Sequence, residues 1–140
     1  MSISHSVNYV LFADDIKIYG SDHTMLQEAV NSIVDWSVAW CLPIAPQKTA
    51  LLQLGSNNPC LSYVVKNELI TRTTSTRDLG VIVDDKLKFE KHINSKVALA
   101  NLKAGYILRA FRFVDEQKYI ALFNIYVRPI IEYCSEVFNP

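Results

Sequence analysis

The chain has 140 residues, of which 50% are hydrophobic and 20% are charged, and its formal net charge is zero. This composition excludes an intrinsically disordered chain, and the length is enough for one domain with a core of its own. The charges are unevenly spread: the stretch before Lys48 carries five acids and one base, Lys17, whereas residues 86–112 carry seven bases and one acid, Glu90. Such asymmetry is expected where one part of a chain holds metal and another faces phosphates.

The cysteines and the apolar runs bear on location. Cys41, Cys60 and Cys134 are odd in number and widely spaced, which is typical of reduced intracellular thiols rather than of a disulfide framework or a zinc site. The first residues lack the basic region and apolar block of a signal peptide. No apolar run approaches the about 18 residues that span a bilayer, so we expect no membrane partner.

Residues 9–19 contain two short apolar runs that meet at adjacent carboxylates, Asp14 and Asp15. The β-favouring residues on each side and the turn-forming acids predict a β-hairpin with the acids at its tip. Two acids on a rigid turn supply the hard oxygen ligands that Mg²⁺ prefers, as two-metal phosphoryl transfer requires. The alternative is an ordinary turn that is rich in Asp.

A helix is predicted next, capped by Ser21 or Asp22 and running to about Trp40, because apolar residues recur at steps of three and four. Residues 50–54 then predict a buried strand. Lys48 directly precedes this strand, and a solvated lysine is the alternative to a functional one.

Residues 61–83 predict a second β stretch, with a turn at Lys66 and Asn67 and a Thr- and Ser-rich link before residues 79–83. Gly80 suits a close approach of the backbone in a plain hairpin. Asp84 or Asp85 is placed to cap the following helix, which we favour over metal ligation.

The last third predicts helices. Residues 86–111 have apolar positions at steps of three and four and a basic outer face, which suits the phosphate backbone of a nucleic acid; a solvated face is the alternative. The candidate backbone contacts are Lys88, Lys91, Lys96 and Lys103. Asp115 is expected to cap the next helix, and Arg128-Pro129 is expected to end or kink it before a restart with Pro129 in the first turn.

Several of these segments resemble one family. Phe12-Ala13-Asp14-Asp15 between strand-like flanks resembles the catalytic hairpin of reverse transcriptases. The segments at residues 40–49, 77–92 and 126–133 resemble the non-LTR retrotransposon branch of that family. The likeness covers about residues 7–140, with one departure at Ala45, where an Asn is common in the family.

The resemblance implies an α+β fold: the C-terminal part of a polymerase palm with a primer-positioning hairpin at residues 1–83, and a helical thumb at residues 84–140. Asp14 would be a Mg²⁺ ligand, Asp15 a weaker ligand or electrostatic neighbour, and Lys48 an acid that helps pyrophosphate leave. The primer end would lie near Leu79, Gly80 and Val81. The partners implied are a template-primer duplex of RNA or DNA and a deoxynucleoside triphosphate, and the location implied is the nucleus.

The resemblance also implies missing parts. The family's fingers and its first catalytic Asp strand would lie upstream of Met1, and two-metal catalysis needs carboxylates from two strands. We therefore expect a truncated reverse transcriptase that is inactive alone, with an incomplete magnesium site and exposed apolar surface that favours self-association. The alternatives are a nucleic-acid-binding or complementing module without polymerase activity, and an unrelated α+β interaction domain.

Overall fold

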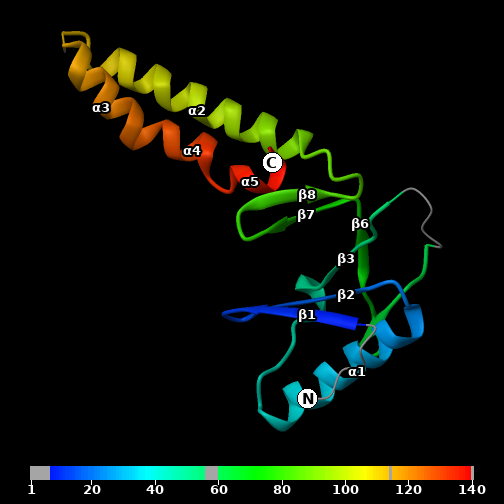
Figure 1. Ribbon diagram of the computed structural model, residues 1–140. Helices are drawn as coiled ribbons and strands as arrows, with labels where there is room; N and C mark the ends of the chain where they lie inside the picture. The colour runs from blue at the N-terminus through cyan, green and yellow to red at the C-terminus, as the bar shows by residue number, and fades with distance from the viewer. Residues whose placement is uncertain (1–6, 56–59, 114, 140) are drawn as a thin grey trace. The chain divides into compact units, whose positions relative to one another are not determined.

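The computed structural model describes residues 7–55, 60–113 and 115–139 (Figure 1). It has the predicted α+β fold. The chain forms two compact units, Met1–Thr74 (unit 1) and Ser75–Pro140 (unit 2), which are treated separately below. The assignment of a palm to residues 1–83 and a thumb to residues 84–140 stays a prediction.

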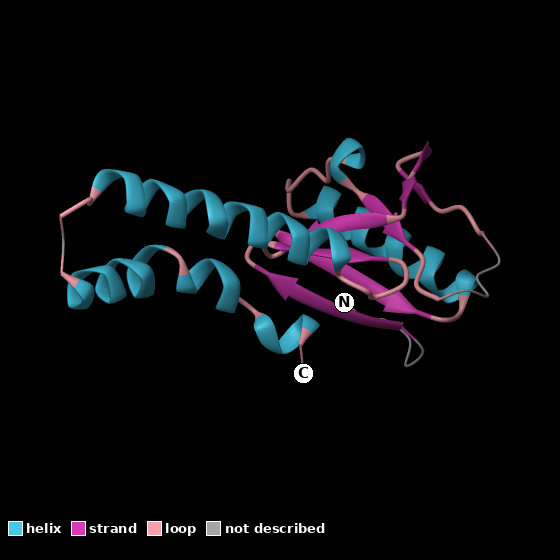
Figure 2. Cartoon of the chain, turned by 90° about the horizontal axis from the view of Figure 1, so that it is seen from above, coloured by secondary structure: helices cyan, strands magenta, loops and turns pink. Residues whose placement is uncertain are grey.

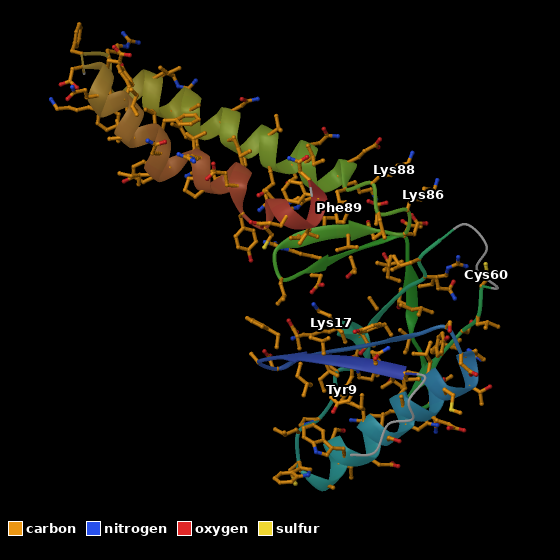
Figure 3. All side chains as sticks on the ribbon, in the orientation of Figure 1. Tyr9, Lys17, Cys60, Lys86, Lys88 and Phe89 are labelled. Carbon is orange, nitrogen blue, oxygen red and sulfur yellow. The ribbon has the colours of Figure 1, made fainter. Side chains whose placement is uncertain are left out.

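Unit 1 begins with the predicted hairpin. Strands β1 (Val7–Phe12) and β2 (Asp15–Gly20) are antiparallel, and Phe12 pairs with Asp15 across a two-residue turn. Side chains alternate between the two faces of a strand, so Tyr9 and Lys17 project from opposite faces of the hairpin (Figure 3). The hairpin and the acids at its tip are confirmed.

Helix α1 (His23–Ala39) packs on this hairpin. Its start is capped as predicted, because the Asp22 carboxylate accepts a hydrogen bond from the backbone N–H of Met25 at 3.0 Å. The apolar stripe of the helix buries Ala29 and Ile33, which form the core of unit 1 with Val7, Tyr63 and Val65.

Two further pairs of short strands complete unit 1. After a 3₁₀ turn, η1 (Pro46–Lys48), strand β3 (Ala50–Leu52) pairs in parallel with β6 (Thr71–Thr73). The prediction of a buried strand is wrong, because Ala50 is exposed and the rest of β3 is only half-buried. The prediction of a plain link in the Thr- and Ser-rich segment is also wrong, because strand pairing extends into it.

Strands β4 (Val64–Val65) and β5 (Glu68–Leu69) form the small hairpin predicted around Lys66 and Asn67. Both turn residues have positive φ, 50° and 66°, as the favoured two-residue hairpin turn requires. Gln27 of α1 holds this hairpin: its amide donates to the Val64 carbonyl at 2.9 Å and accepts from the Val64 N–H at 3.0 Å.

Unit 2 joins a hairpin to a set of helices. Strands β7 (Ser75–Asp78) and β8 (Val81–Asp84) are antiparallel. The chain then runs out along α2 (Glu90–Ala110). It returns beside α2 (Figure 2) through α3 (Glu116–Tyr126), α4 (Arg128–Glu132) and α5 (Ser135–Phe138). Among the described residues of unit 2, Val81, His92, Ala100 and Val127 are buried.

Two of the three helix starts predicted in unit 2 are confirmed. Asp115 caps α3 by accepting from the N–H of Lys118 at 2.9 Å, and α4 restarts the helix with Pro129 in its first turn. The predicted cap of α2 by Asp84 or Asp85 is wrong, because α2 begins at Glu90, after the left-handed residue Phe89. None of the described helices has the length and apolar character needed to cross a membrane.

Candidate functional site

The acidic tip of the β1–β2 hairpin is the first candidate site. Ala13 and Asp14 form its turn, and Ala13 has a φ of 51°, which is unusual for a residue with a side chain. Asp14 and Asp15 are both exposed, and within the described residues neither makes an ion pair or a side-chain hydrogen bond. Two adjacent, solvated carboxylates are therefore presented on one tight turn.

These two acids fit part of a magnesium site. Carboxylate oxygens are the ligands Mg²⁺ prefers, and the ion keeps other positions for water and phosphates. Two-metal chemistry needs more carboxylates than one turn carries. The described part of the chain contains no group of three or more His, Cys, Asp or Glu residues that could hold a metal.

Lys48 belongs to another element of unit 1. It ends the 3₁₀ turn η1, its backbone N–H donates to the Ala45 carbonyl at 3.1 Å, and its side chain is exposed. No interaction joins Lys48 to Asp14 or Asp15 among residues 7–55. Its role as a leaving-group acid stays a prediction.

The predicted primer-positioning residues lie at the turn between β7 and β8. Leu79 and Gly80 form this two-residue turn with φ values of 44° and 89°, and Val81 follows as the buried first residue of β8. The Tyr133 hydroxyl donates to the Leu79 carbonyl at 2.8 Å. Sequence reasoning missed this contact, because no local pattern connects residues 54 positions apart.

Tyr133 is also placed to remain a hydrogen-bond donor. The adjacent Cys134 side chain, through hydrogen bonding and then through the negative charge of its thiolate form, raises the pKa of the Tyr133 phenol above its ordinary value. The phenol therefore keeps its proton at neutral pH.

The three cysteines form no disulfide, and Cys41 and Cys60 are exposed.

His92 ties α2 to the same hairpin. Only 1% of the residue is exposed, and its Nδ1 accepts a hydrogen bond from the Ile82 N–H at 3.2 Å. Burial, and then the charge of Lys96, lower the pKa of the imidazole below its usual value. His92 also packs against Phe138 of α5, with ring centroids 4.9 Å apart.

Asp84 organises the loop that leads into α2. Its carboxylate accepts from the backbone N–H groups of Lys86, Lys88 and Phe89, at 3.0, 3.2 and 2.6 Å. Burial would raise the pKa of Asp84, but these hydrogen bonds outweigh it and lower the pKa. Asp84 thus holds a loop that presents Lys86 and Lys88 to solvent (Figure 3).

The predicted backbone-contacting lysines do not form one stripe. Lys88 lies in the loop before α2, and Lys91 donates to the Ser75 hydroxyl at 3.1 Å. Lys96 and Lys103 share one side of α2, about 140° around the helix axis from Lys91. The Lys96 ammonium lies 5.7 Å from the centroid of the Tyr133 ring. The structure therefore brings Lys96 together with the β7–β8 turn and separates it from Lys91.

Comparisons with known proteins find relatives of this chain. The RNA-directed DNA polymerase from mobile element jockey of Drosophila funebris is 24% identical over 138 aligned residues, which cover 91% of this chain. The chain is thus distantly similar to an RNA-directed DNA polymerase. It spans 15% of the length of that polymerase, so the likeness is to one segment of a much longer protein.

A second relative carries no functional description. The uncharacterized protein B0403.1 of Caenorhabditis elegans is 46% identical over 63 residues, which cover 45% of this chain and 32% of that protein. No family model matches the chain, and no solved structure matches it. The functional argument therefore rests on the jockey relationship and on the residues themselves.

Proposed function

We propose that the chain is a segment of a non-LTR retrotransposon reverse transcriptase, the C-terminal part of its palm followed by its thumb. The observation that carries the proposal is the exposed Asp14-Asp15 pair on the two-residue turn of β1–β2. The relationship to the jockey polymerase, which extends over 91% of the chain, supports it. The complete enzyme would copy an RNA template into DNA.

In that enzyme Asp14 is a ligand of catalytic Mg²⁺, and Asp15 is a weaker ligand or an electrostatic neighbour. Magnesium would supply the charge that steadies the attacking and leaving oxygens. Further carboxylates must come from another strand, so this chain alone is proposed to be inactive. Lys48 would protonate the departing pyrophosphate.

The second unit would hold the template-primer duplex. The Leu79-Gly80 turn and Val81 would lie near the primer end, and Lys88, Lys91, Lys96 and Lys103 would contact the phosphate backbone. An intracellular, nuclear location follows from this proposal alone. Exposed apolar side chains on the hairpin and helices are expected to promote self-association when the segment is isolated.

A second candidate is a nucleic-acid-binding module without polymerase activity. The observation in its favour is the solvent-exposed pair Lys86 and Lys88, on a loop that Asp84 holds in place. Exposed lysines on a loop whose backbone is held in place suit sequence-independent contact with phosphates. Such a module would bind a duplex without added Mg²⁺ and would synthesise no DNA.

The first test is the transcript upstream of the Met1 codon. An open frame that encodes an Asp-bearing strand and fingers would support the polymerase, and the continuous protein can then be expressed and assayed for Mg²⁺-dependent primer extension. Asp14→Asn is expected to reduce extension by about 100-fold or more, because it removes a metal ligand. The matched control is Asp35→Asn, which changes an exposed acid on α1 and is expected to leave extension unchanged.

Two outcomes would contradict the proposed polymerase function. Stop codons throughout the upstream frame would leave the binding module as the surviving candidate, to be tested by duplex binding at low salt. Equal extension by the Asp14→Asn and Asp35→Asn proteins would show that the acidic turn holds no catalytic metal.

A further inference from the structure

The turn between β7 and β8 is held in a costly conformation by a residue from the other end of unit 2. A φ of 44° is unfavourable for Leu79, whereas the 89° of Gly80 costs glycine little. The Tyr133 hydroxyl bonds the Leu79 carbonyl at 2.8 Å, and its ring lies so close to Gly80 that a Cβ there would be 3.2 Å from Tyr133 Cε1. Tyr133 therefore both bonds and covers the turn.

The same aromatic ring holds a cation. Lys96 is half-buried, and its ammonium lies 5.7 Å from the ring centroid, a distance at which the ring attracts a positive charge. One helical turn before Lys96, His92 binds the Ile82 N–H of β8. The hairpin is thus fixed to α2 at its second strand and to the end of α4 at its turn, with Lys96 between these attachments.

We propose that Tyr133 is a positioning residue that presents the Leu79-Gly80 turn and the Lys96 ammonium together to the phosphodiester backbone of a nucleic-acid strand. Ordering the turn and the lysine before binding lowers the entropy lost on binding, and an ammonium is a suitable contact for a phosphate. This inference rests on the proposed function, since it assigns the residue that positions the same primer-positioning turn and Lys96.

The experiment compares Tyr133→Phe with Tyr106→Phe in the full 140-residue chain. Tyr106 is an exposed tyrosine of α2 whose ring also carries a cation, Arg109, at 5.1 Å, so it matches Tyr133 except for contact with the turn. Two quantities are measured: amide hydrogen exchange at residues 79–81, and binding of a fluorescent RNA–DNA primer-template duplex at low salt, followed by anisotropy. Thermal melting checks that each variant is folded.

Loss of the Tyr133 hydroxyl is expected to speed exchange at the turn and to weaken duplex binding by about two- to tenfold, the effect of one hydrogen bond. The dependence of binding on salt should stay as in the parent, because no charge is removed. Lys96→Gln should reduce the slope of log K against log salt by about 0.9, and Lys96→Arg should restore it. Tyr106→Phe should match the parent in both measurements.

Different results would overturn different statements. If the parent chain binds the duplex and Tyr133→Phe matches Tyr106→Phe in affinity, the positioning role is wrong and the proposed function stands. If Lys96→Gln leaves the salt slope unchanged, Lys96 contacts no phosphate and the inference is wrong. If the parent chain binds no duplex at low salt, the inference and the duplex-binding role proposed for this unit both fail.

Discussion

Two of the described hairpins, β1–β2 and β7–β8, have the same plan and different support. In β1–β2 and in β7–β8, antiparallel strands are joined by two residues, and the first of these is a non-glycine residue with positive φ, Ala13 at 51° and Leu79 at 44°. Next to the β7–β8 turn, Val81 is 5% exposed. Next to the β1–β2 turn, Leu11 and Phe12 are 60% and 58% exposed.

The difference lies in what holds each turn. The Leu79 carbonyl accepts a hydrogen bond from the Tyr133 hydroxyl, and the Ile82 N–H of β8 donates one to His92. Side chains of unit 2 therefore fix the β7–β8 hairpin. Within the described residues of unit 1, no side-chain hydrogen bond reaches Ala13, Asp14 or Asp15. A left-handed residue is strained, and contacts from elsewhere in the fold can offset that strain. We therefore expect the β7–β8 turn, which has such contacts, to be more rigid than the β1–β2 turn.

The largest expected effect tests whether the stability of β1–β2 depends on its packing against α1. Ile33→Ala removes a buried side chain of α1, 4% exposed, and is expected to lower the free energy of unfolding of unit 1 by about 2–5 kcal/mol. Amide exchange should become faster in β1–β2 and much less so in β7–β8. Hydrogen exchange followed by NMR measures both hairpins in one sample.

The matched control is Val127→Ala, which opens a cavity in the core of unit 2, where Val127 is 2% exposed. It should speed exchange in β7–β8 and α2 and leave β1–β2 nearly unchanged. If each substitution loosens both hairpins equally, the two units unfold together and the contrast between the hairpins does not describe their stability.

Local signals predicted much of this fold. The acidic hairpin, the Asp22 and Asp115 caps, the Lys66-Asn67 turn and the restart at Pro129 each depend on residues within about four positions of one another. Such patterns can be read directly from a sequence because the interaction that fixes the structure lies inside the pattern.

The errors occurred where the partner of a segment lies outside the pattern of that segment. The Thr- and Ser-rich segment became β6 and β7 because Ala50–Leu52 and Val81–Asp84 supply pairing partners, which its own composition does not indicate. Helix α2 begins late because the Asp84 carboxylate bonds three N–H groups of the preceding loop.

The candidate site shows the same division. The acidic pair could be predicted from four consecutive residues, whereas the contact of Tyr133 with Leu79 depends on α4 returning beside α2. The sequence pattern also placed the lysines on one basic face, but Lys91 and Lys96 lie on different sides of α2.

A pH titration sharpens the comparison at β7–β8. The pKa of His92 is lowered from 6.5, so the unfolded chain takes up the proton first as the pH falls. The stability that neutral His92 confers is complete above about pH 6.5 and is lost as the pH falls through its lower folded value. Exchange at Ile82 should therefore rise as the pH falls below about 6.5, after correction for intrinsic exchange rates, with no matching rise in β1–β2.

The control is His92→Gln, which cannot titrate and should remove this pH dependence. Asp84 does not confuse the result: its pKa is lowered from 3.8, so its stabilising effect is present above that value and is lost only at more acidic pH. An unchanged pH profile in His92→Gln would mean that another group controls the joint between β8 and α2.

The smallest expected effect tests the strain in the acidic turn directly. Ala13→Gly removes the side chain that makes a φ of 51° unfavourable, and this gain exceeds the extra entropy of a glycine in the unfolded chain, so unit 1 should become more stable by about 0.5–1 kcal/mol. Ala98→Gly is the control: Ala98 lies exposed within α2, where the same change should destabilise unit 2 by about 1 kcal/mol. Urea unfolding followed by exchange in each unit gives both values. If Ala13→Gly destabilises unit 1, the turn stores no strain. The acidic hairpin would then differ from β7–β8 only in the exposed apolar side chains next to its turn.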